Sequence, residues 1–404
     1  MKVLVVNDNL LEGGTEIYVK NLIKILLTKN HDLRLITFDN DFDAKIINYD
    51  IDHKIIKNIK HSKLDKIKFN KKMYLELKYY IDDFSPDRII VNNLFASPFT
   101  QYKALSGYEC YQVVHDYHFI CPKSTCIKSN YEVCSGYNEK CLKYCKYHNS
   151  KILLKVKEIQ TKKLEKIRKK YIKKFIAPSE CLKQYLDNYD YNVACLNNPV
   201  DVNKFQCLNY KKLNKQRIYT YVGMINERKG IFKFLDAFSK FSINNDVILN
   251  VIGKCSTEDD ERKLNQYLNN QKIIYLGKMS NDEVLMKLQN SNFLIVPSLW
   301  MENYPTTVIE GMLTKNLILG SNRGGIPEML SNDKGMIFDI MNQDSILDVL
   351  EQSYKIDEKI YNEILEKAYI FTKNHNSGEK YYDKLIDVME DNKWINIYFL
   401  MVNC

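Results

Sequence analysis

Two glutamates separated by seven residues, Glu302 and Glu310, have the types and spacing that could bind the hydroxyl groups of a ligand. We expect Glu302 to lie in a loop and Glu310 in a short helix that begins near Thr306. Carboxylates accept hydrogen bonds from hydroxyls, and the N-terminus of a helix suits a phosphate. The pattern therefore predicts a ligand that carries both phosphate and hydroxyl groups.

Glu310 also has a simpler interpretation. Thr307 and Glu310 have the spacing of a capping box, in which both side chains bond backbone N–H groups at the start of a helix. For that pair alone the cap is the better interpretation. Glu302 and the glycine pair Gly324–Gly325 favour the binding site.

These residues follow two short apolar segments that are typical of buried strands. Phe293–Val296 precedes Glu302, and Leu317–Leu319 precedes the glycine pair. Open α/β sheets bind their ligands outside the carboxyl ends of parallel strands. We therefore expect the two loops to meet at one edge of a parallel sheet.

Another loop carries cations that could act on a phosphate. The predicted strand Ile218–Val222 ends in a glycine, and Arg228 and Lys229 follow it directly before a helix. Cations in such a loop could neutralise a departing diphosphate without a metal ion. A solvated loop cation is the alternative for Arg228.

Two motifs in the first half of the chain also follow predicted strands. Gly13–Gly14 opens a helix after the first strand, which suits either phosphate binding or simply a tight turn. His115 ends the strand Gln112–His115 and is followed by Asp116. A lone histidine in such a place is more often structural than catalytic.

Five cysteines gather within 25 residues. Four thiolates could hold a structural zinc, with His118 or His148 able to replace one of them, and a loop of thiols without metal is the alternative. An iron–sulfur cluster is less favoured. The cluster comprises Cys121, Cys126, Cys134, Cys141 and Cys145, of which the last four are the candidate zinc ligands.

The segment Lys151–Lys174 is strongly basic. It holds eleven Lys and Arg against Glu158 and Glu165, a balance of +9 that equals the formal net charge of the whole chain. Its apolar residues recur three or four apart, which predicts a helix whose apolar face packs on the domain. The basic face could contact an anionic membrane surface, or it could simply be solvated.

Length and composition indicate a two-domain globular protein. The 404 residues exceed one ordinary core, and 45% of them are hydrophobic. No apolar run approaches the ~20 residues that span a bilayer, and the first residues lead into a strand rather than a signal peptide. Eleven cysteines without a signal peptide argue against a disulfide framework. We therefore expect a cytoplasmic protein that could bind peripherally to the inner face of the plasma membrane.

Apolar strands alternate with helices throughout, which predicts parallel, doubly wound sheets. The pattern restarts after a linker-like turn at Asn197–Asp201. The fold class is therefore α/β, with two tandem Rossmann-like domains.

The stretch Val296–Met329 resembles the E-x7-E motif of the retaining glycosyltransferases of family 4 (glycosyl transferases group 1), which have the GT-B fold. Further residues stand at the usual spacing of that family: Ser298, Asn303, Pro305, Gly324, Gly325 and Glu328. The resemblance implies two domains that face across an interdomain cleft. It assigns 1–200 to an acceptor-side domain with a cysteine-rich insertion (121–145), 201–380 to the nucleotide-sugar domain, and 381–404 to a segment that packs back on the first domain.

The resemblance also implies roles for individual residues. Glu310 would hold the ribose, Glu302 would lie beside the transferred sugar and its leaving phosphate, and Lys229 would contact the phosphate. His115 would bind a sugar hydroxyl, so that Glu302, His115 and Lys229 form the catalytic set. The donor-binding set is Gly13, Gly14, Arg228, Lys229, Ser298, Asn303, Tyr304, Pro305, Thr306 and Glu310.

By the same resemblance, the expected activity is transfer of a hexose-type sugar from a UDP- or GDP-type donor to a glycan or lipid-linked acceptor. Bacterial capsule, O-antigen or exopolysaccharide synthesis would be the setting, and catalysis would need no cofactor. One departure is Met224, which stands where the family commonly has an arginine, and it keeps a catalytically degenerate GT-B scaffold as an alternative. A basic, zinc-containing nucleic-acid-binding protein is a weaker alternative, because it does not explain Glu302 and Glu310. We therefore expect no nucleic-acid partner.

Overall fold

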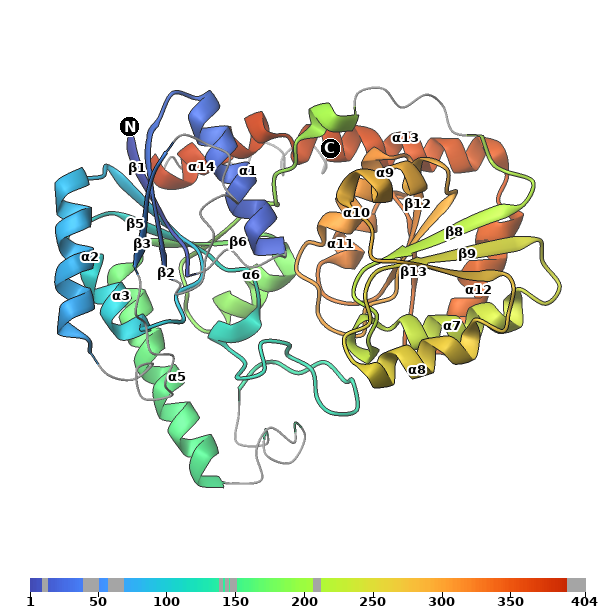
Figure 1. The fold of residues 1–404 in the computed structure, drawn as a ribbon, viewed down its shortest axis with the longest axis horizontal. Coiled ribbons are helices and arrows are strands. Elements are labelled where there is room, and N and C mark those ends of the chain that lie inside the picture. Colours follow the sequence, from blue (N-terminus) through green and yellow to red (C-terminus); the bar gives the residue numbers. More distant parts are fainter. Residues whose placement is uncertain are drawn as a thin grey trace, which may run out of the picture. The chain divides into compact units, whose positions relative to one another are not determined.

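The computed structural model describes residues 1–8, 14–38, 51–56, 69–137, 141, 145, 151–205 and 212–390, and for residues 151–155 the backbone alone. The chain divides into two compact units, each built on its own parallel sheet (Figure 1). Met1–Ser124, Gly136–Pro199 and the helix α14 (Gly378–Glu390) belong to the first unit. Thr125–Ser135 and Val200–Ser377 form the second.

The first sheet has the strand order β3-β2-β1-β4-β5-β6-β7 within the described residues, and every pairing is parallel. Most residues of its interior strands are buried, as expected where helices cover both faces. The strands are β1 (Lys2–Val6), β2 (Asp32–Phe38), β3 (Asp52–Ile56), β4 (Arg88–Val91), β5 (Cys110–Val113), β6 (Lys174–Ala177) and β7 (Val193–Cys195). The helices are α1 (Gly14–Thr28), α2 (Lys71–Phe84), α3 (Pro98–Ala104), α5 (Lys151–Tyr171) and α6 (Glu180–Asp187), together with α14.

The second sheet has the order β10-β9-β8-β11-β12-β13 and is also parallel throughout. Its strands are β8 (Arg217–Val222), β9 (Val247–Ile252), β10 (Ile273–Gly277), β11 (Phe293–Val296), β12 (Leu317–Ser321) and β13 (Met336–Phe338). Its helices are α7 (Ile231–Phe241), α8 (Glu258–Tyr267), α9 (Asn281–Gln289), α10 (Thr306–Leu313), α11 (Ile326–Leu330), α12 (Gln343–Lys355) and α13 (Glu358–His375).

The last described helix completes the core of the first unit. Tyr381, Leu385 and Met389 of α14 are buried against residues of α1, β1 and β5. The hydroxyl of Tyr381 is hydrogen-bonded to that of Tyr18 in α1. Of the predicted C-terminal segment 381–404, residues 391–404 lie outside the described residues.

The predicted fold class of two tandem parallel α/β modules is confirmed. The segment Thr125–Ser135, which the sequence analysis assigned to the first domain, packs instead with the second unit. No helix in the described part of the chain is long and apolar enough to cross a membrane.

Candidate active site

Three neighbouring strands of the second sheet carry the predicted site residues in the loops that follow them. β11 lies between β8 and β12, and all three run in the same direction. Their carboxyl ends therefore share one edge of the sheet. Lys229 follows β8, Ser298 and Glu302 follow β11, and Gly324 follows β12.

The loop after β8 is joined to the loop after β11 through the backbone. The carbonyl oxygen of Arg228 accepts hydrogen bonds from Leu299 N (3.0 Å) and Trp300 N (3.2 Å). Gly230 has a φ of 70°, and a Cβ atom there would lie 1.8 Å from the carbonyl oxygen of Pro297. Only glycine permits this close approach in a left-handed conformation. The side chain of Arg228 is exposed, so its backbone is what fixes the loop.

Three donors converge on a single oxygen of Glu302. Its Oε1 accepts hydrogen bonds from Lys229 Nζ (2.6 Å), Ser298 Oγ (2.6 Å) and Trp300 Nε1 (2.5 Å). The ammonium group of Lys229 also lies 4.7 Å from the centroid of the Trp300 ring. The other oxygen, Oε2, makes no hydrogen bond with the described residues and is left for a ligand.

The environment of Glu302 keeps its side chain ionised. Burial alone would raise the pKa of this carboxyl, but the charge of Lys229 and the three donors outweigh that effect and hold the pKa below its usual value. At neutral pH the pair is a carboxylate bound to an ammonium group. Glu302 can therefore accept hydrogen bonds or stabilise positive charge, and it has no proton to donate.

The glycine turn after β12 holds the backbone of Glu302. Gly325 N donates to the Glu302 carbonyl oxygen over 2.6 Å. Gly324 has a φ of 58°, and a Cβ atom there would lie 1.9 Å from the same oxygen. Ser321 Oγ donates to the Ser298 carbonyl oxygen over 2.8 Å and fixes the start of the loop. The structure thus brings Lys229, Ser298, Glu302 and the glycine pair together.

The capping-box interpretation of Glu310 is wrong. The helix α10 begins at Thr306 with Pro305 as its N-cap, so Thr307 lies inside the helix, and no side chain caps it. The carboxyl group of Glu310 makes no hydrogen bond or ion pair with the described residues. Burial raises the pKa of Glu310 to about 7, and the positive charge of Lys204 opposes this rise in part. A half-buried carboxyl without a structural partner suits a ligand.

The remaining residues of the same loop have mixed environments. Tyr304 is 5% exposed and packs in the core with Val308 and Ile309. Pro305 sets the start of α10, and Thr306 is its first residue. Asn303, like Thr306, is partly buried.

The predicted residues of the first unit form a separate cluster. His115 lies two residues beyond β5, and its Nε2 is 3.0 Å from Asn92 Oδ1. The ring meets that of Tyr18 edge to face at 4.9 Å. Burial lowers the pKa of His115 to about 4, so its imidazole is neutral at physiological pH. Gly14 opens α1, while Gly13 lies outside the described residues.

Asp116, the partner of His115 in the sequence motif, has a structural role. Its carboxylate accepts the backbone N–H of His118 at 2.7 Å and caps a short 3-10 turn. Burial raises the pKa of Asp116, but the neighbouring His118 outweighs this and leaves the pKa below its ordinary value. Asp116 therefore remains ionised and holds the turn after β5.

The cysteines are divided between the two units. Cys126 and Cys134 lie in a small hairpin of the second unit, in which Cys134 N donates to Cys126 O. Cys141 and Cys145 pack together in the first unit. Within the described residues, no three His, Cys, Asp or Glu side chains are grouped so that they could hold a metal ion. His148 lies outside those residues, and the structural zinc stays a prediction.

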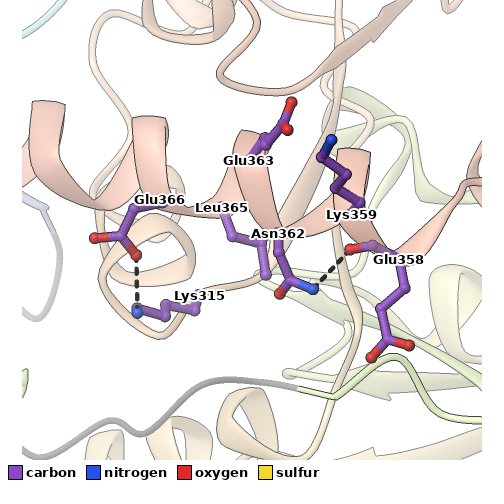
Figure 2. Close-up of a pocket in the computed structure, with 7 residues that line it drawn as sticks. All are labelled: Lys315, Glu358, Lys359, Asn362, Glu363, Leu365 and Glu366. Atoms are coloured by element: carbon purple, nitrogen blue, oxygen red, sulfur yellow. Dashed lines mark hydrogen bonds and ion pairs between the residues drawn. The ribbon is translucent and has the colours of Figure 1, made fainter.

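A pocket of about 550 Å³ lies elsewhere on the second unit, along α13 (Figure 2). None of the predicted site residues lines it. Both lysines and glutamates line it. One lysine and one glutamate are already paired with each other, through the ion pair between Lys315 Nζ and Glu366 Oε2 (3.0 Å). This pocket therefore has no excess of positive charge with which to bind a phosphate.

Sequence reasoning missed two residues that act directly on the candidate site. Trp300 donates to Glu302 and lies beside Lys229. Lys204 acts electrostatically on Glu310 from a short 3-10 turn. The rarity of tryptophan, two in the whole chain, was the available signal for Trp300. Lys204 is distant from Glu310 in the sequence, and no sequence signal indicated it.

Two protein-family models match this chain. Residues 12–204 match the family described as Glycosyltransferase Family 4, and residues 208–369 match Glycosyl transferases group 1. No curated protein matches the sequence.

Solved glycosyltransferase structures share the fold over nearly the whole chain. HepE of Anabaena, solved in complex with UDP, has a TM-score of 0.74 at 12% identity, over 97% of this chain and 100% of that chain. A glycosyltransferase of Rickettsia africae has a TM-score of 0.71 at 19% identity, over 96% and 98%. The lipopolysaccharide outer core galactosyltransferase WaaB has a TM-score of 0.68 at 16% identity, over 97% and 99%.

The two family matches together extend over nearly all of the two units, and the fold is that of the solved glycosyltransferases. The chain belongs to the glycosyltransferases of family 4 (glycosyl transferases group 1), with the GT-B fold.

Proposed function

We propose that the protein is a retaining glycosyltransferase that moves a hexose-type sugar from a UDP- or GDP-type donor to a glycan or lipid-linked acceptor. The observation that carries this proposal is the Lys229–Glu302 ion pair at the carboxyl edge of the second sheet. The setting would be bacterial surface polysaccharide synthesis. Support comes from relatives of the same fold, one solved with UDP and another described as a lipopolysaccharide galactosyltransferase.

In the reaction, the acceptor oxygen bonds to the anomeric carbon on the face from which the diphosphate leaves. The bond between that carbon and the phosphate oxygen breaks, and the acceptor proton passes to the leaving phosphate. Lys229 neutralises the charge that develops on the diphosphate, which is the kind of electrostatic assistance worth several kcal/mol. Glu302 Oε1 already accepts three hydrogen bonds, which weakens it as a nucleophile and favours this direct route. No cofactor has a part in these steps.

Glu310 and His115 supply positioning. The carboxylate of Glu310 accepts hydrogen bonds from the ribose hydroxyls of the donor. The neutral imidazole of His115 bonds a hydroxyl of the transferred sugar, and its pKa of about 4 makes it a weak base. Fixing the reacting groups in this way lowers the entropic part of the barrier.

The experiment that tests the proposal has two stages. Thermal shift with a set of nucleoside diphosphates and nucleotide sugars identifies the donor, because a ligand at 100 times its Kd stabilises the fold by about 2.7 kcal/mol. Transfer of isotope-labelled sugar is then measured for the wild type, Glu302→Ala and Lys229→Ala. We expect turnover by the wild type and a loss of about a hundredfold or more in both variants. Donor binding without turnover by the wild type would favour the degenerate scaffold, which the presence of Met224 leaves as a second candidate.

The same proposal has the enzyme act in the cytoplasm, at the inner face of the plasma membrane, through α5. The prediction that the apolar face of this helix packs on the domain is wrong for two residues, since Val156 is 43% and Ile159 is 54% exposed. Exposed lysines follow these two residues along the same side of the helix, at intervals of three or four residues. This row, which we call the α5 stripe, comprises Val156, Ile159, Lys163, Lys166 and Lys170.

Exposed apolar residues in line with lysines suit the boundary between acyl chains and anionic headgroups. We expect the protein to co-sediment with vesicles that contain phosphatidylglycerol, and less so as salt is raised. Val156→Ser with Ile159→Ser, or Lys163→Glu with Lys166→Glu, should weaken binding at least fivefold. Ile243→Ser is the matched control, because Ile243 is 74% exposed on the other unit. Binding that ignores both anionic lipid and salt would contradict the proposal.

A further inference from the structure

Arg323 is a buried cation without a partner in the described part of the chain. It stands between β12 and α11, directly before Gly324, and is 7% exposed. Its Nε is buried without a hydrogen bond, and its guanidinium makes no ion pair there. The carboxylate of Asp339 acts on it electrostatically but does not bond to it.

Such a group is costly to keep in a folded protein. A charge removed from water and left unpaired loses its hydration without replacement, which destabilises the folded state. A buried guanidinium is usually paired with a carboxylate or a phosphate, whose oxygens match its fork of donors. The empty partner position points to an anion that is part of the working state.

The position of Arg323 in the fold indicates which anion. Gly324 and Gly325, the next two residues, hold the carbonyl oxygen of Glu302. Glu302 follows β11, which lies between β8 and β12 in the sheet. Lys229 follows β8 and Arg323 follows β12. At this edge of the sheet, a cation therefore stands in the loop after each of the two strands that neighbour β11.

The charge balance favours a second cation at this site. Lys229 is ion-paired with Glu302, so the pair as a whole is neutral. A nucleotide sugar carries a negative charge on each of its two phosphates. On the β8 side Met224 is uncharged, and Arg228, a predicted donor-binding residue, has an exposed side chain that is not held in place among the site residues as Arg323 is.

We propose that Arg323 is the second phosphate-binding cation of this enzyme and donates hydrogen bonds to the diphosphate of the bound nucleotide. This inference rests on the proposed function and adds a binding residue to it. The unpaired guanidinium of the empty protein is then a preformed anion site. Lys229 and Arg323 share the two phosphates between them.

The test compares nucleotide affinity with the stability of the empty protein. Affinities for UDP, GDP and the corresponding nucleosides are measured by calorimetry and ligand-observed NMR for the wild type, Arg323→Met and Arg323→Lys. We expect Arg323→Met to weaken binding of the diphosphate at least tenfold and to leave binding of the nucleoside unchanged. Arg323→Lys keeps the charge and should recover part of the loss. The melting temperature of ligand-free Arg323→Met should equal or exceed that of the wild type, because an unpaired buried charge is removed.

A structural role for Arg323 predicts different results. If Arg323 served mainly to balance Asp339, then Arg323→Met and Asp339→Asn would both lower the melting temperature of the empty protein, and diphosphate affinity would stay unchanged. That outcome overturns the inference. If the wild type binds none of the nucleotides, the proposed function fails and the inference falls with it. Binding by the wild type with unchanged diphosphate affinity in Arg323→Met overturns the inference alone.

Discussion

At the scale of single residues, the arrangement around Glu302 shows how a carboxylate can be charged, buried and still available. Three donors hold one oxygen and fix the plane of the group, so that the second oxygen has a defined direction. The ion pair with Lys229 keeps the carboxylate ionised in spite of its burial. Under the proposed function, the same ammonium group meets the leaving phosphate, so that one contact would serve both stability and catalysis.

Removing Lys229 should expose this dual role. Lys229→Met leaves Glu302 buried with two uncharged donors, which should lower the free energy of unfolding at pH 7 by roughly 2 kcal/mol. The pKa of Glu302 lies below its ordinary 4.5 in the folded protein, so its contribution is present above that pH and is lost as the pH falls. The deficit of the variant in urea unfolding should therefore be largely constant from pH 7 to about pH 4.5 and should shrink below that pH. The control is Lys263→Met, whose exposed pairs with Glu227 and Asp259 should cost under about 0.5 kcal/mol. Equal losses in the two variants would contradict the prediction.

Glu310 should give the opposite dependence on pH. Burial raises its pKa from 4.5 to about 7, so the folded state holds a proton that the unfolded state has released between these values. Stability from this group is complete below pH 4.5 and falls by up to about 3 kcal/mol as the pH rises to 7. Glu310→Gln should remove that decline, and it should abolish the gain in nucleotide affinity that we expect between pH 6 and pH 8 when the carboxylate forms. A pH series of melting temperature and Kd measures both. Parallel curves for the two proteins would show that Glu310 does not titrate there.

The sequence was sufficient to find Glu302, Lys229 and the glycine turn, because their identity and spacing survive in the linear chain. It was not sufficient for Trp300 or Arg323. The contact of Trp300 with Glu302 depends on the path of the loop, and the lack of a partner for Arg323 depends on what the fold leaves around it. Neither property can be inferred from the neighbouring residues in the sequence. The capping-box error at Thr307 has the same origin, since the start of the helix was decided by Pro305.

At the scale of elements, close approach of backbones fixes the site. Gly230 and Gly277 have nearly the same φ, 70° and 72°, but a Cβ atom at Gly230 would strike Pro297 O whereas one at Gly277 would meet no atom within 4 Å. Gly277→Ala should therefore cost only the left-handed strain, about 1 kcal/mol. Gly230→Ala should cost several kcal/mol, or should move the Lys229 loop away from Glu302 and lower kcat. Unfolding in urea and a turnover assay separate these results, and equal costs would show that the two loops are not tightly joined.

The same scale explains which strands could be predicted. The interior strand β11 is a continuous apolar run, and the sequence analysis indicated it as Phe293–Val296. The sequence analysis did not indicate β3, β7 or β13, and all of these lie at sheet edges. Edge strands face solvent on one side and are short, so their composition differs little from that of a loop. The segment Asp52–Ile56, with its charged first half, is an example.

At the scale of the whole molecule, the two units do not correspond to two uninterrupted stretches of the sequence. The repeat of strands and helices predicted two modules, since each repeat needs its own core. It did not predict that the hairpin at Thr125–Ser135 would pack with the second unit. That hairpin is short, and Tyr131 at its tip packs against the core of the second unit. Such a contact is made by few residues over a long separation in sequence, where periodicity carries no information.

The helix α14 gives a test of this division at long range. Leu385 of α14 is fully buried in the core of the first unit, whereas Leu365 of α13 is 2% exposed in the core of the second. Replacing either by alanine should cost about 2–5 kcal/mol through the cavity that remains. Because each unit has its own core, Leu385→Ala should speed amide hydrogen exchange in β1, β2 and α1 and leave β8, β9 and β11 protected, and Leu365→Ala should do the reverse. Mass spectrometry of peptides from both units measures this. If Leu385→Ala instead speeds exchange in the second sheet as strongly as in the first, the units do not unfold separately, and α14 supports the molecule as one cooperative body.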